Sequence, residues 1–379
     1  MKTEQKSFSG EFLLESKKQF EFSFQPQLIL IFGQPDVLVE SGIAKIYKEL
    51  YPESIITGCS TAGEIFNANV LDDTIAVNAV SFDKTKMEYC SVSLSDVDSV
   101  FDAGKKLLSN FSKNGMRHVF VLSDGIAVNG TDLVHGISSE LPDNVNVTGG
   151  LAGDGANFKK TYVVDGGEIK SGIISAVAFY GDSIAIGYGS LGGWSSFGIE
   201  RSVTRSKGNV LYELDNLPAL EIYKSYLGDQ ASQLPSSGLL FPLSLRTSAD
   251  NEPLVRTILG VDEQNQSLTF AGDIPEGAYV KLMKANIDGL ITGAEGAAEI
   301  SFNKDNGKKP EFAILISCVG RKLVMKQLVE EEVEAVKDVL GDQALITGFY
   351  SYGELAPFQH GTRCELHNQT MTITTFTEI

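Results

Sequence analysis

Apolar runs that are typical of strands alternate with stretches of helical periodicity along most of the chain. The run LILIF at 28–32 is followed by apolar residues at helical spacing and then by a second short run that ends in ITGCSTAGEI. The helix-spaced positions are Val39, Ile43, Ile46 and Leu50. Short apolar runs favour buried parallel strands, and apolar positions three to four residues apart predict an amphipathic helix. The segment 26–65 is therefore predicted to form a βαβ unit.

The same order of elements recurs twice. Residues 310–355 contain FAILIS, an amphipathic stretch and ALITGFYSYGEL, and a middle copy contains HVFVLSDG and VNVTGGLAGDG. The first and last copies match without a gap through Ile56, Thr57, Gly58, Gly63 and Glu64 against Ile346, Thr347, Gly348, Gly353 and Glu354. The middle copy repeats the pattern with one residue fewer between its glycines, through Thr148, Gly149, Gly153 and Asp154. Three copies in one structural context predict an ancestral duplication.

Each copy is followed by a segment in which apolar and polar residues alternate more strongly. These segments lie at 74–82, 174–189 and 371–378. Alternation predicts half-buried antiparallel strands, so the sheets are expected to be mixed. The predicted fold class is α/β, with mixed parallel and antiparallel sheets built from pseudo-repeated βαβ units and with helices packed on the outside.

The remaining segments suggest further helices and a division into two modules. Additional helices are predicted at 96–111, 216–227 and 286–301. Residues 228–250 hold Gly, Pro and Ser without helical periodicity, which predicts a linker. We therefore expect one module at 26–227 and a second at 251–379.

Composition narrows the class of protein. The 379 residues carry 31 Lys plus Arg and 49 Asp plus Glu, a formal charge of −18, which argues against a general nucleic-acid or anionic-membrane surface. The four cysteines form no C-x-x-C pair, so a zinc ribbon or a disulfide framework is not indicated. The first 30 residues have no signal-peptide pattern, and the longest apolar runs are too short to span a bilayer. We expect a cytoplasmic protein.

Several strings together resemble the FIST family, from about residue 26 to the end of the chain. They are GCSTAGEI at 58–65, TGGLAGDGANF at 148–158, GNVLYELDNLPALEIY at 208–223, SCVGR at 317–321, GFYSYGEL at 348–355 and ELHNQTMTITTF at 365–376. The order is that of an N-terminal FIST module followed by its C-terminal partner. The resemblance implies a sensory protein of bacterial signal transduction that binds a small ligand, with amino acids or related carboxylates the usual proposal. It also implies a signalling partner such as a histidine kinase or a cyclic-di-nucleotide enzyme.

The T-G-x-x-x-x-G-E loops are the first candidates for a ligand site. They follow strands whose carboxyl ends are expected at one edge of a sheet, and glycines there let backbone N–H groups approach a carboxylate. Arg321 would open a helix as a carboxylate clamp. The candidate residues are Thr57, Gly58, Cys59, Ser60, Glu64, Gly149, Gly150, Asp154, Cys318, Arg321, Tyr352, Glu354, His367 and Asn368. The alternative is that the glycines form tight turns and that Glu64 and Glu354 pair locally.

Other chemistries have weaker support. Cys59 and Cys318 follow strands, but nothing in the sequence pairs either cysteine with a histidine. Catalysis is therefore not expected, and a cysteine-dependent enzyme is kept as the second alternative. The G-x-G-x-x-G match at 187–192 is followed by β-like sequence and not by a helix, so a dinucleotide site is rejected. No metal-ligand spacing occurs, and no cofactor is expected. The resemblance also implies an alternative, because one FIST branch is associated with haem and nitric oxide sensing: a haem-based nitric oxide sensor that regulates a histidine kinase. The acidic run at 330–334 is expected to be solvated.

Overall fold

The three predicted repeats fold as three equivalent units, here called units I, II and III. The computed structural model describes residues 1–9, 17–248, 253–302, 308–357 and 361–379. Unit I contains β1 (Lys2–Ser9), β2 (Leu28–Gly33), α1 (Pro35–Ser41), α2 (Ile43–Leu50), β3 (Ile55–Ser60), β4 (Glu64–Phe66), β5 (Asn69–Leu71) and β6 (Thr74–Ser81). Unit II contains β7 (Lys86–Ser93), α3 (Val100–Ser109), β8 (Met116–Ser123), α4 (Gly130–Ser138), β9 (Asn146–Leu151), β10 (Val163–Asp165), β11 (Glu168–Lys170) and β12 (Ile173–Tyr180).

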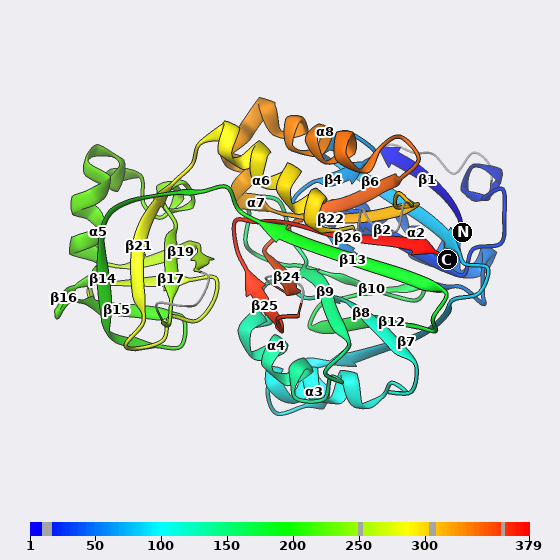
Figure 1. Ribbon diagram of the computed structural model, residues 1–379, viewed down its shortest axis with the longest axis horizontal. Helices are drawn as coiled ribbons and strands as arrows, with labels where there is room; N and C mark the ends of the chain where they lie inside the picture. The colour runs from blue at the N-terminus through cyan, green and yellow to red at the C-terminus, as the bar shows by residue number, and fades with distance from the viewer. Residues whose placement is uncertain (10–16, 249–252, 303–307, 358–360) are drawn as a thin grey trace.

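Unit III is interrupted by a small domain, which covers residues 195–284. The unit contains β13 (Ile184–Leu191), α6 (Ile287–Ile300), β22 (Phe312–Cys318), α7 (Val319–Met325), α8 (Val329–Leu340), β23 (Leu345–Ser351), β24 (Gly353–Pro357), β25 (Cys364–His367) and β26 (Met371–Glu378). Figure 1 shows the small domain to one side of the three units, joined to them by two chain crossings.

The small domain is a strongly bent β-sheet with one α-helix. Its elements are β14 (Ser195–Lys207), β15 (Val210–Leu214), β16 (Leu217–Pro218), α5 (Ala219–Leu227), the 3-10 helices η3 (Gly228–Gln233) and η4 (Ser236–Leu240), β17 (Leu243–Arg246), β18 (Leu254–Arg256), β19 (Ile258–Asp262), β20 (Ser267–Phe270) and β21 (Tyr279–Lys284). The predicted linker 228–250 is therefore folded over its described part, and Leu243 and Leu245 are buried in the core of this domain. Sequence analysis missed this because short 3-10 turns and a four-residue strand have too little periodicity to detect.

The sheets of the three units share one topology. In each, a central parallel pair is flanked by antiparallel strands, as predicted: β2 with β3, β8 with β9, and β22 with β23. The outermost hairpin of each sheet is supplied by a different unit. Hairpin β4–β5 pairs with β23 of unit III, β10–β11 with β3 of unit I, and β24–β25 with β9 of unit II. The units thus exchange hairpins in a closed cycle.

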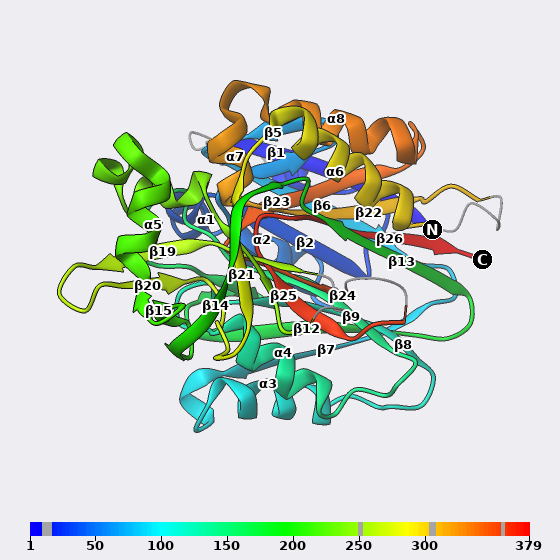
Figure 2. The same ribbon diagram turned by 60° about the vertical axis from the view of Figure 1, so that its left-hand side comes forward.

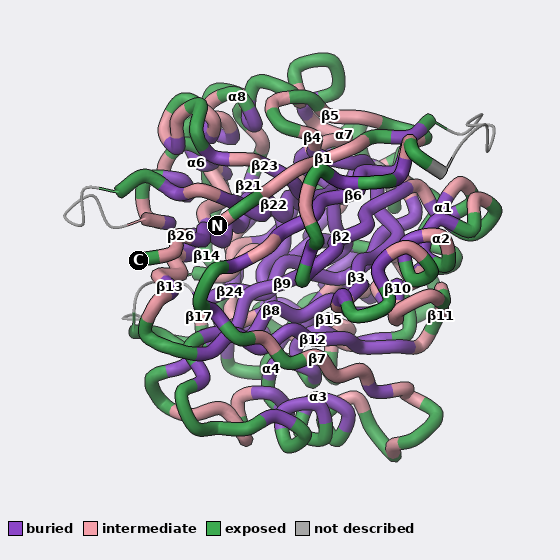
Figure 3. The backbone as a smooth tube through the Cα atoms, turned by 90° about the vertical axis from the view of Figure 1, so that its right-hand side faces the viewer, coloured by how far each residue is buried: buried purple, intermediate pink, exposed green. Residues whose placement is uncertain are grey.

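The inner faces of the three sheets form one core. Leu30, Phe120 and Ile314 occupy equivalent positions on β2, β8 and β22 and belong to the same buried cluster. Figure 3 shows that these central strands are buried along their length, whereas exposed backbone lies mainly at the periphery. The mixed α/β class with helices outside is therefore confirmed.

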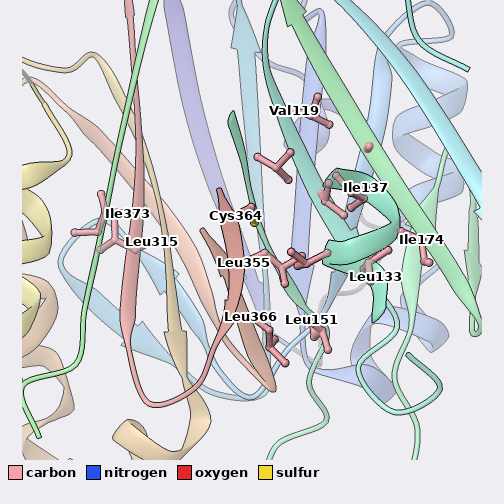
Figure 4. Packing of buried hydrophobic residues seen from close by; sticks show 14 of the residues in the cluster. Val119, Leu133, Ile137, Leu151, Ile174, Leu315, Leu355, Cys364, Leu366 and Ile373 are labelled. Atoms are coloured by element: carbon pink, nitrogen blue, oxygen red, sulfur yellow. The ribbon is translucent and has the colours of Figure 1, made fainter. Parts of the chain in front are cut away.

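A helix pair covers the outer face of each sheet: α1 and α2 on unit I, α3 and α4 on unit II, and α6 and α8 on unit III. Figure 4 shows Leu133 and Ile137 of α4 packed near Val119 and Ile174 of the sheet of unit II. No helix among the described residues is long and apolar enough to cross a membrane.

The first glycine of each repeated motif lies inside a strand. It does not form a tight turn, which was the alternative that the sequence left open. Gly58, Gly149 and Gly348 are residues of β3, β9 and β23. A Cβ atom at these positions would lie 1.8, 1.9 and 1.8 Å from the carbonyl oxygens of Ile31, Val121 and Leu315 on the neighbouring parallel strand. Only glycine permits this approach, so the repeated T-G pair serves strand packing.

Replacing any one of these three glycines by alanine is expected to destabilise the protein by at least about 2 kcal/mol, because a backbone oxygen cannot move aside as a side chain can. Gly260→Ala is the matched control, since its added Cβ would make only an ordinary contact at 3.8 Å. Urea unfolding monitored by circular dichroism measures both effects. Similar midpoints for Gly348→Ala and Gly260→Ala would contradict the packing role.

Candidate functional site: the repeated loops and a cavity beside the small domain

The three motif loops lie together, as expected for a shared site, but their backbone groups form hydrogen bonds with one another. Backbone amides of each loop donate to carbonyl oxygens of another: Ala62 to Tyr350 at 2.9 Å, Gly153 to Ser60 at 2.9 Å, Gly155 to Thr61 at 3.2 Å, Tyr350 to Gly63 at 2.9 Å and Tyr352 to Leu151 at 3.2 Å. The Ser60 hydroxyl also donates to the Gly153 carbonyl at 2.7 Å. These donors were expected to face a ligand. In the structure they join the units.

Glu64 and Glu354 form two equivalent buried clusters. Glu64 accepts hydrogen bonds from the hydroxyls of Thr61 and Thr74, both at 2.5 Å. Glu354 accepts from the hydroxyls of Ser351 at 2.7 Å and Thr370 at 2.9 Å. Both carboxyls are fully buried. They pair locally, which is the alternative that the sequence left open.

Burial controls the protonation of these two carboxyls. Desolvation raises the pKa of Glu64 to about 7 and that of Glu354 to about 8, although the neighbouring hydroxyls act in the opposite direction. Both groups therefore change charge near neutral pH in the folded protein.

Asp154 is not the third member of this set, and the sequence alignment of the middle repeat is wrong at this point. Cys59 of β3 and Phe349 of β23 occupy equivalent positions in their sheets. Strand pairing places Val163 of β10 opposite Cys59 and Glu64 opposite Phe349, so Val163 is the counterpart of Glu64. Asp154 lies in a longer loop that precedes β10. Its carboxylate accepts the backbone amides of residues 158, 159 and 160 at 2.7–2.9 Å and the hydroxyl of Tyr352. It shapes that loop.

Arg321 does not face a cavity. Its side chain is 0% exposed and pairs with Glu332 of α8 through two N–H···O bonds of 2.9 and 2.7 Å. The remaining guanidinium N–H groups donate to the carbonyls of Gly192, Leu290 and Gln369. Every nitrogen of the guanidinium thus has an acceptor within the chain. Glu332 is correspondingly buried, so the solvated acidic face expected at 330–334 is wrong at this residue.

The other predicted residues also have internal partners. Thr57 contacts Ser175 through their hydroxyls at 3.0 Å, and Cys59 lies in the inner core. Gly150 packs in β9 against Ile316. His367 lies 3.0 Å from the Ala356 carbonyl through Nε2, and Asn368 donates to the His367 carbonyl. Burial lowers the pKa of His367 to about 4.

A cavity of about 810 Å³ lies between the small domain and units II and III. Its body-side wall comes from the β8–α4 turn, the loop that bears Asp154, and α7. The opposite wall comes from η4, β19 and β20 of the small domain. Figure 2 brings the small domain, with α5 and β19, in front of the three units, and η4 of this domain contacts α7. Of the residues predicted from sequence, only Cys318 and Tyr352 are among those that line it.

The chemistry of the cavity is mainly apolar. Phe158 and Tyr352 stack in its wall, with ring centroids 4.4 Å apart and an interplanar angle of 14°. Ile126, Phe158 and Leu259 are large apolar side chains that remain substantially exposed, and all three line this cavity. Exposed apolar groups gathered at one hollow are typical of a ligand site. Sequence reasoning missed the cavity because its walls come from separate segments spread between residues 125 and 352.

Cysteine and histidine chemistry has no assembled site among the described residues. Desolvation raises the pKa of the Cys59 and Cys318 thiols well above its ordinary value. His118, His135 and His367 do not line the cavity, and His360 lies outside the described residues. The described part of the chain also contains no group of three or more His, Cys, Asp or Glu placed to hold a metal ion. The described residues that line the cavity therefore supply no histidine ligand for a haem.

The fold and the cavity together define a repeated α/β protein with an inserted domain and an interdomain cavity. Residues 27–217 match the FIST N domain and residues 219–357 match the FIST C domain. The chain belongs to the FIST family, and the boundary between the two matched regions falls in the small domain. FIST domains are sensory domains that bind small ligands in signalling proteins.

Other similarities are distant. An uncharacterized protein of Methanocaldococcus jannaschii is 23% identical over 316 residues, which cover 76% of this chain and 59% of that protein. The chain thus spans about three fifths of that relative's length. A chorismatase crystal structure matches 99% of this chain and 98% of its own at 9% identity, with a TM-score of 0.37. A cyanuric acid hydrolase from A. caulinodans matches 78% and 99% at 9% identity, with a TM-score of 0.19. Scores this low carry no inference about activity.

Arg321→Met is expected to lower the free energy of unfolding by about 3–5 kcal/mol, because it leaves Glu332 buried without its counter-charge. Adding Glu332→Leu should recover part of the loss. Arg205→Met is the control, since its pair with Glu213 is largely exposed. Guanidinium unfolding measures all of these variants. An unchanged midpoint for Arg321→Met would show that the buried pair does not stabilise the fold.

The buried carboxyls predict a pH-dependent stability. Because folding raises the pKa of Glu64 and Glu354 above the ordinary value of 4.5, the folded state holds more protons than the unfolded state between about pH 4.5 and 8. Their contribution is full below this range and is lost as the pH rises through it. Buried His118 and His367, whose pKa values are lowered, act in the opposite direction.

The contribution of the two carboxyls is therefore measured as the difference between the unmodified protein and a variant that lacks both. Urea midpoints across this pH range should fall more steeply for the unmodified protein than for Glu64→Gln/Glu354→Gln, in which no carboxyl titrates at these sites. Parallel pH curves for the two proteins would contradict the assignment.

Proposed function

We propose that this protein is a sensory component of a bacterial signalling pathway, which binds a small ligand in the cavity between the small domain and units II and III. The observation that carries the proposal is the origin of the cavity walls. One wall belongs to the small domain and the other to the units. A bound molecule would contact both parts, so its binding would depend on how they are arranged.

The short helix α7 connects the cavity to the junction between the small domain and the units. Val319 and Leu323 of α7 line the cavity, and Arg321 of the same helix faces the other way. Its guanidinium binds the carbonyls of Gly192 and Leu290, which lie just before and just after the small domain. Both chain crossings are thus fastened to one side chain. A ligand that shifts α7 would shift the anchor of the small domain.

The junction is further held by apolar packing. Trp194, Met283, Leu290 and Met325 form a buried cluster at the two crossings, and the Trp194 indole donates to the Gln369 carbonyl at 2.8 Å. Ligand binding needs a different affinity for two arrangements of this junction to produce a signal. We propose that a partner, such as a histidine kinase or a cyclic-di-nucleotide enzyme in the cytoplasm, recognises the change.

We also propose that the protein acts without catalysis and without a resident cofactor. The raised pKa of the Cys318 thiol makes it a poor nucleophile at neutral pH. Among the described residues that line the cavity, Lys326 is the only charged one, so no acid and base pair faces a ligand there. Lys326 is suited to the carboxylate of an amino acid or a related acid, as the family resemblance implies.

The test is a thermal-shift screen of amino acids and other small carboxylates, because a ligand present at about 100 times its Kd adds about 2.7 kcal/mol to the free energy of unfolding. A hit should lose its effect in Ala156→Trp, where an indole added at an exposed lining position would occupy part of the cavity. Ala127→Trp is the control, since Ala127 is exposed nearby and does not line the cavity. A hit that stabilises both variants equally binds elsewhere and would overturn the proposed site.

A further inference from the structure

The distribution of charge in the cavity restricts the chemistry of its ligand. Most of the lining side chains are apolar, and three of them are aromatic: Phe158, Phe270 and Tyr352. Lys326 is exposed, carries the only charge among the described lining residues, and has no ion-pair partner among them. An apolar cavity with one cationic group suits a molecule with an apolar body and one negative charge.

The backbone is strained where this charge and part of the aromatic wall are presented. Phe158 has φ 53°, and Lys326 has φ 53° and ψ −116°. Residues with a side chain rarely adopt such conformations, and they persist where surrounding contacts enforce them. For Phe158 the enforcing contacts are the Asp154 carboxylate, which binds its amide at 2.7 Å, and the stack on Tyr352. Both strained residues line the cavity.

One polar group of the wall also lacks a partner. The side chain of Thr257 is 3% exposed, and its Oγ1 makes no hydrogen bond within the described structure. A buried hydroxyl without a partner costs free energy. Thr257 lines the cavity, so this unpaired hydroxyl lies in the wall of the proposed site.

A zwitterion fits this arrangement less well than a simple anion. An ammonium group transferred from water into the cavity is stabilised best by an acidic partner, since an unpaired buried charge is strongly unfavourable. No acidic side chain is among the described residues that line the cavity. The nearby Asp154 carboxylate is already occupied by three backbone amides and a phenol.

We propose that the ligand is an amphipathic monoanion with a flat apolar body, which packs against the aromatic wall while its carboxylate binds Lys326. This inference rests on the proposed function and narrows it, because it excludes free amino acids as the preferred ligands.

The experiment uses the full chain and three compounds of defined chemistry. Isothermal titration calorimetry is carried out with 2-naphthoate, with the neutral 2-naphthamide, and with L-phenylalanine as an aromatic zwitterion. Each is tested on the unmodified protein, Lys326→Gln, Lys159→Gln and Ala156→Trp. Lys159→Gln removes the same charge from an exposed residue of the neighbouring loop that does not line the cavity.

The expected result is that 2-naphthoate binds at least about tenfold more tightly than the amide, as a charge-assisted hydrogen bond provides. Lys326→Gln should remove this preference, Lys159→Gln should keep it, and Ala156→Trp should abolish binding. If 2-naphthoate and 2-naphthamide bind with equal affinity and Lys326→Gln changes neither value, the proposal of an anionic ligand is wrong. The proposal that the cavity is the binding site would still stand. Preferred binding of L-phenylalanine would have the same two consequences. Binding of any compound that Ala156→Trp does not weaken would overturn the cavity, and with it the proposed function.

Discussion

The close approach of two parallel backbones is the constraint on which the rest of the structure depends. At Gly58, Gly149 and Gly348 the central strands come so near to their neighbours that a Cβ would overlap a carbonyl oxygen. This brings the three motif loops into register, so that their amides and carbonyls bind one another across unit boundaries. The exchanged hairpins then extend each sheet with strands of another unit. No unit completes its own sheet, and stability is therefore a property of all three together.

This arrangement explains why the proposed ligand site lies away from the repeated loops. Backbone donors that could have met a carboxylate already have acceptors, and the acidic residues of the loops are held by hydroxyls of their own units. A close-packed centre has no volume left for a ligand. The cavity instead lies where the insertion in unit III meets the repeated body. There the packing of two separately formed cores, one in the units and one in the small domain, need not be complete.

The repeated parts of the fold can be predicted from the sequence, whereas the contacts that depart from the repeat cannot. Strand and helix periodicity repeats three times, and the equivalence of Glu64 with Glu354 follows from an ungapped match. The hairpin exchange leaves no local signal, because a hairpin has the same pattern whichever sheet it joins. The partner of Arg321 lies on a different helix, so spacing alone could not separate an internal ion pair from a ligand clamp. Lys326, which carries the single charge among the described lining residues, has no sequence signal of its own, because its role depends on the apolar residues around it.

Two departures from the threefold pattern lie at the proposed ligand site. Where units I and III have a hydroxyl, a glutamate and a threonine, unit II has Ala152, Val163 and Ile173 at the equivalent positions, all buried. The loop between Ala152 and Val163 is longer than its counterparts, and it presents Phe158 to the cavity. Unit III departs in a different way, since it alone contains the small domain and the Arg321–Glu332 pair that fastens it. Repeated features maintain the fold in every unit, whereas these two departures meet at one place. Their meeting point is the cavity, because the extended loop of unit II and α7 of unit III form its wall on the side of the units.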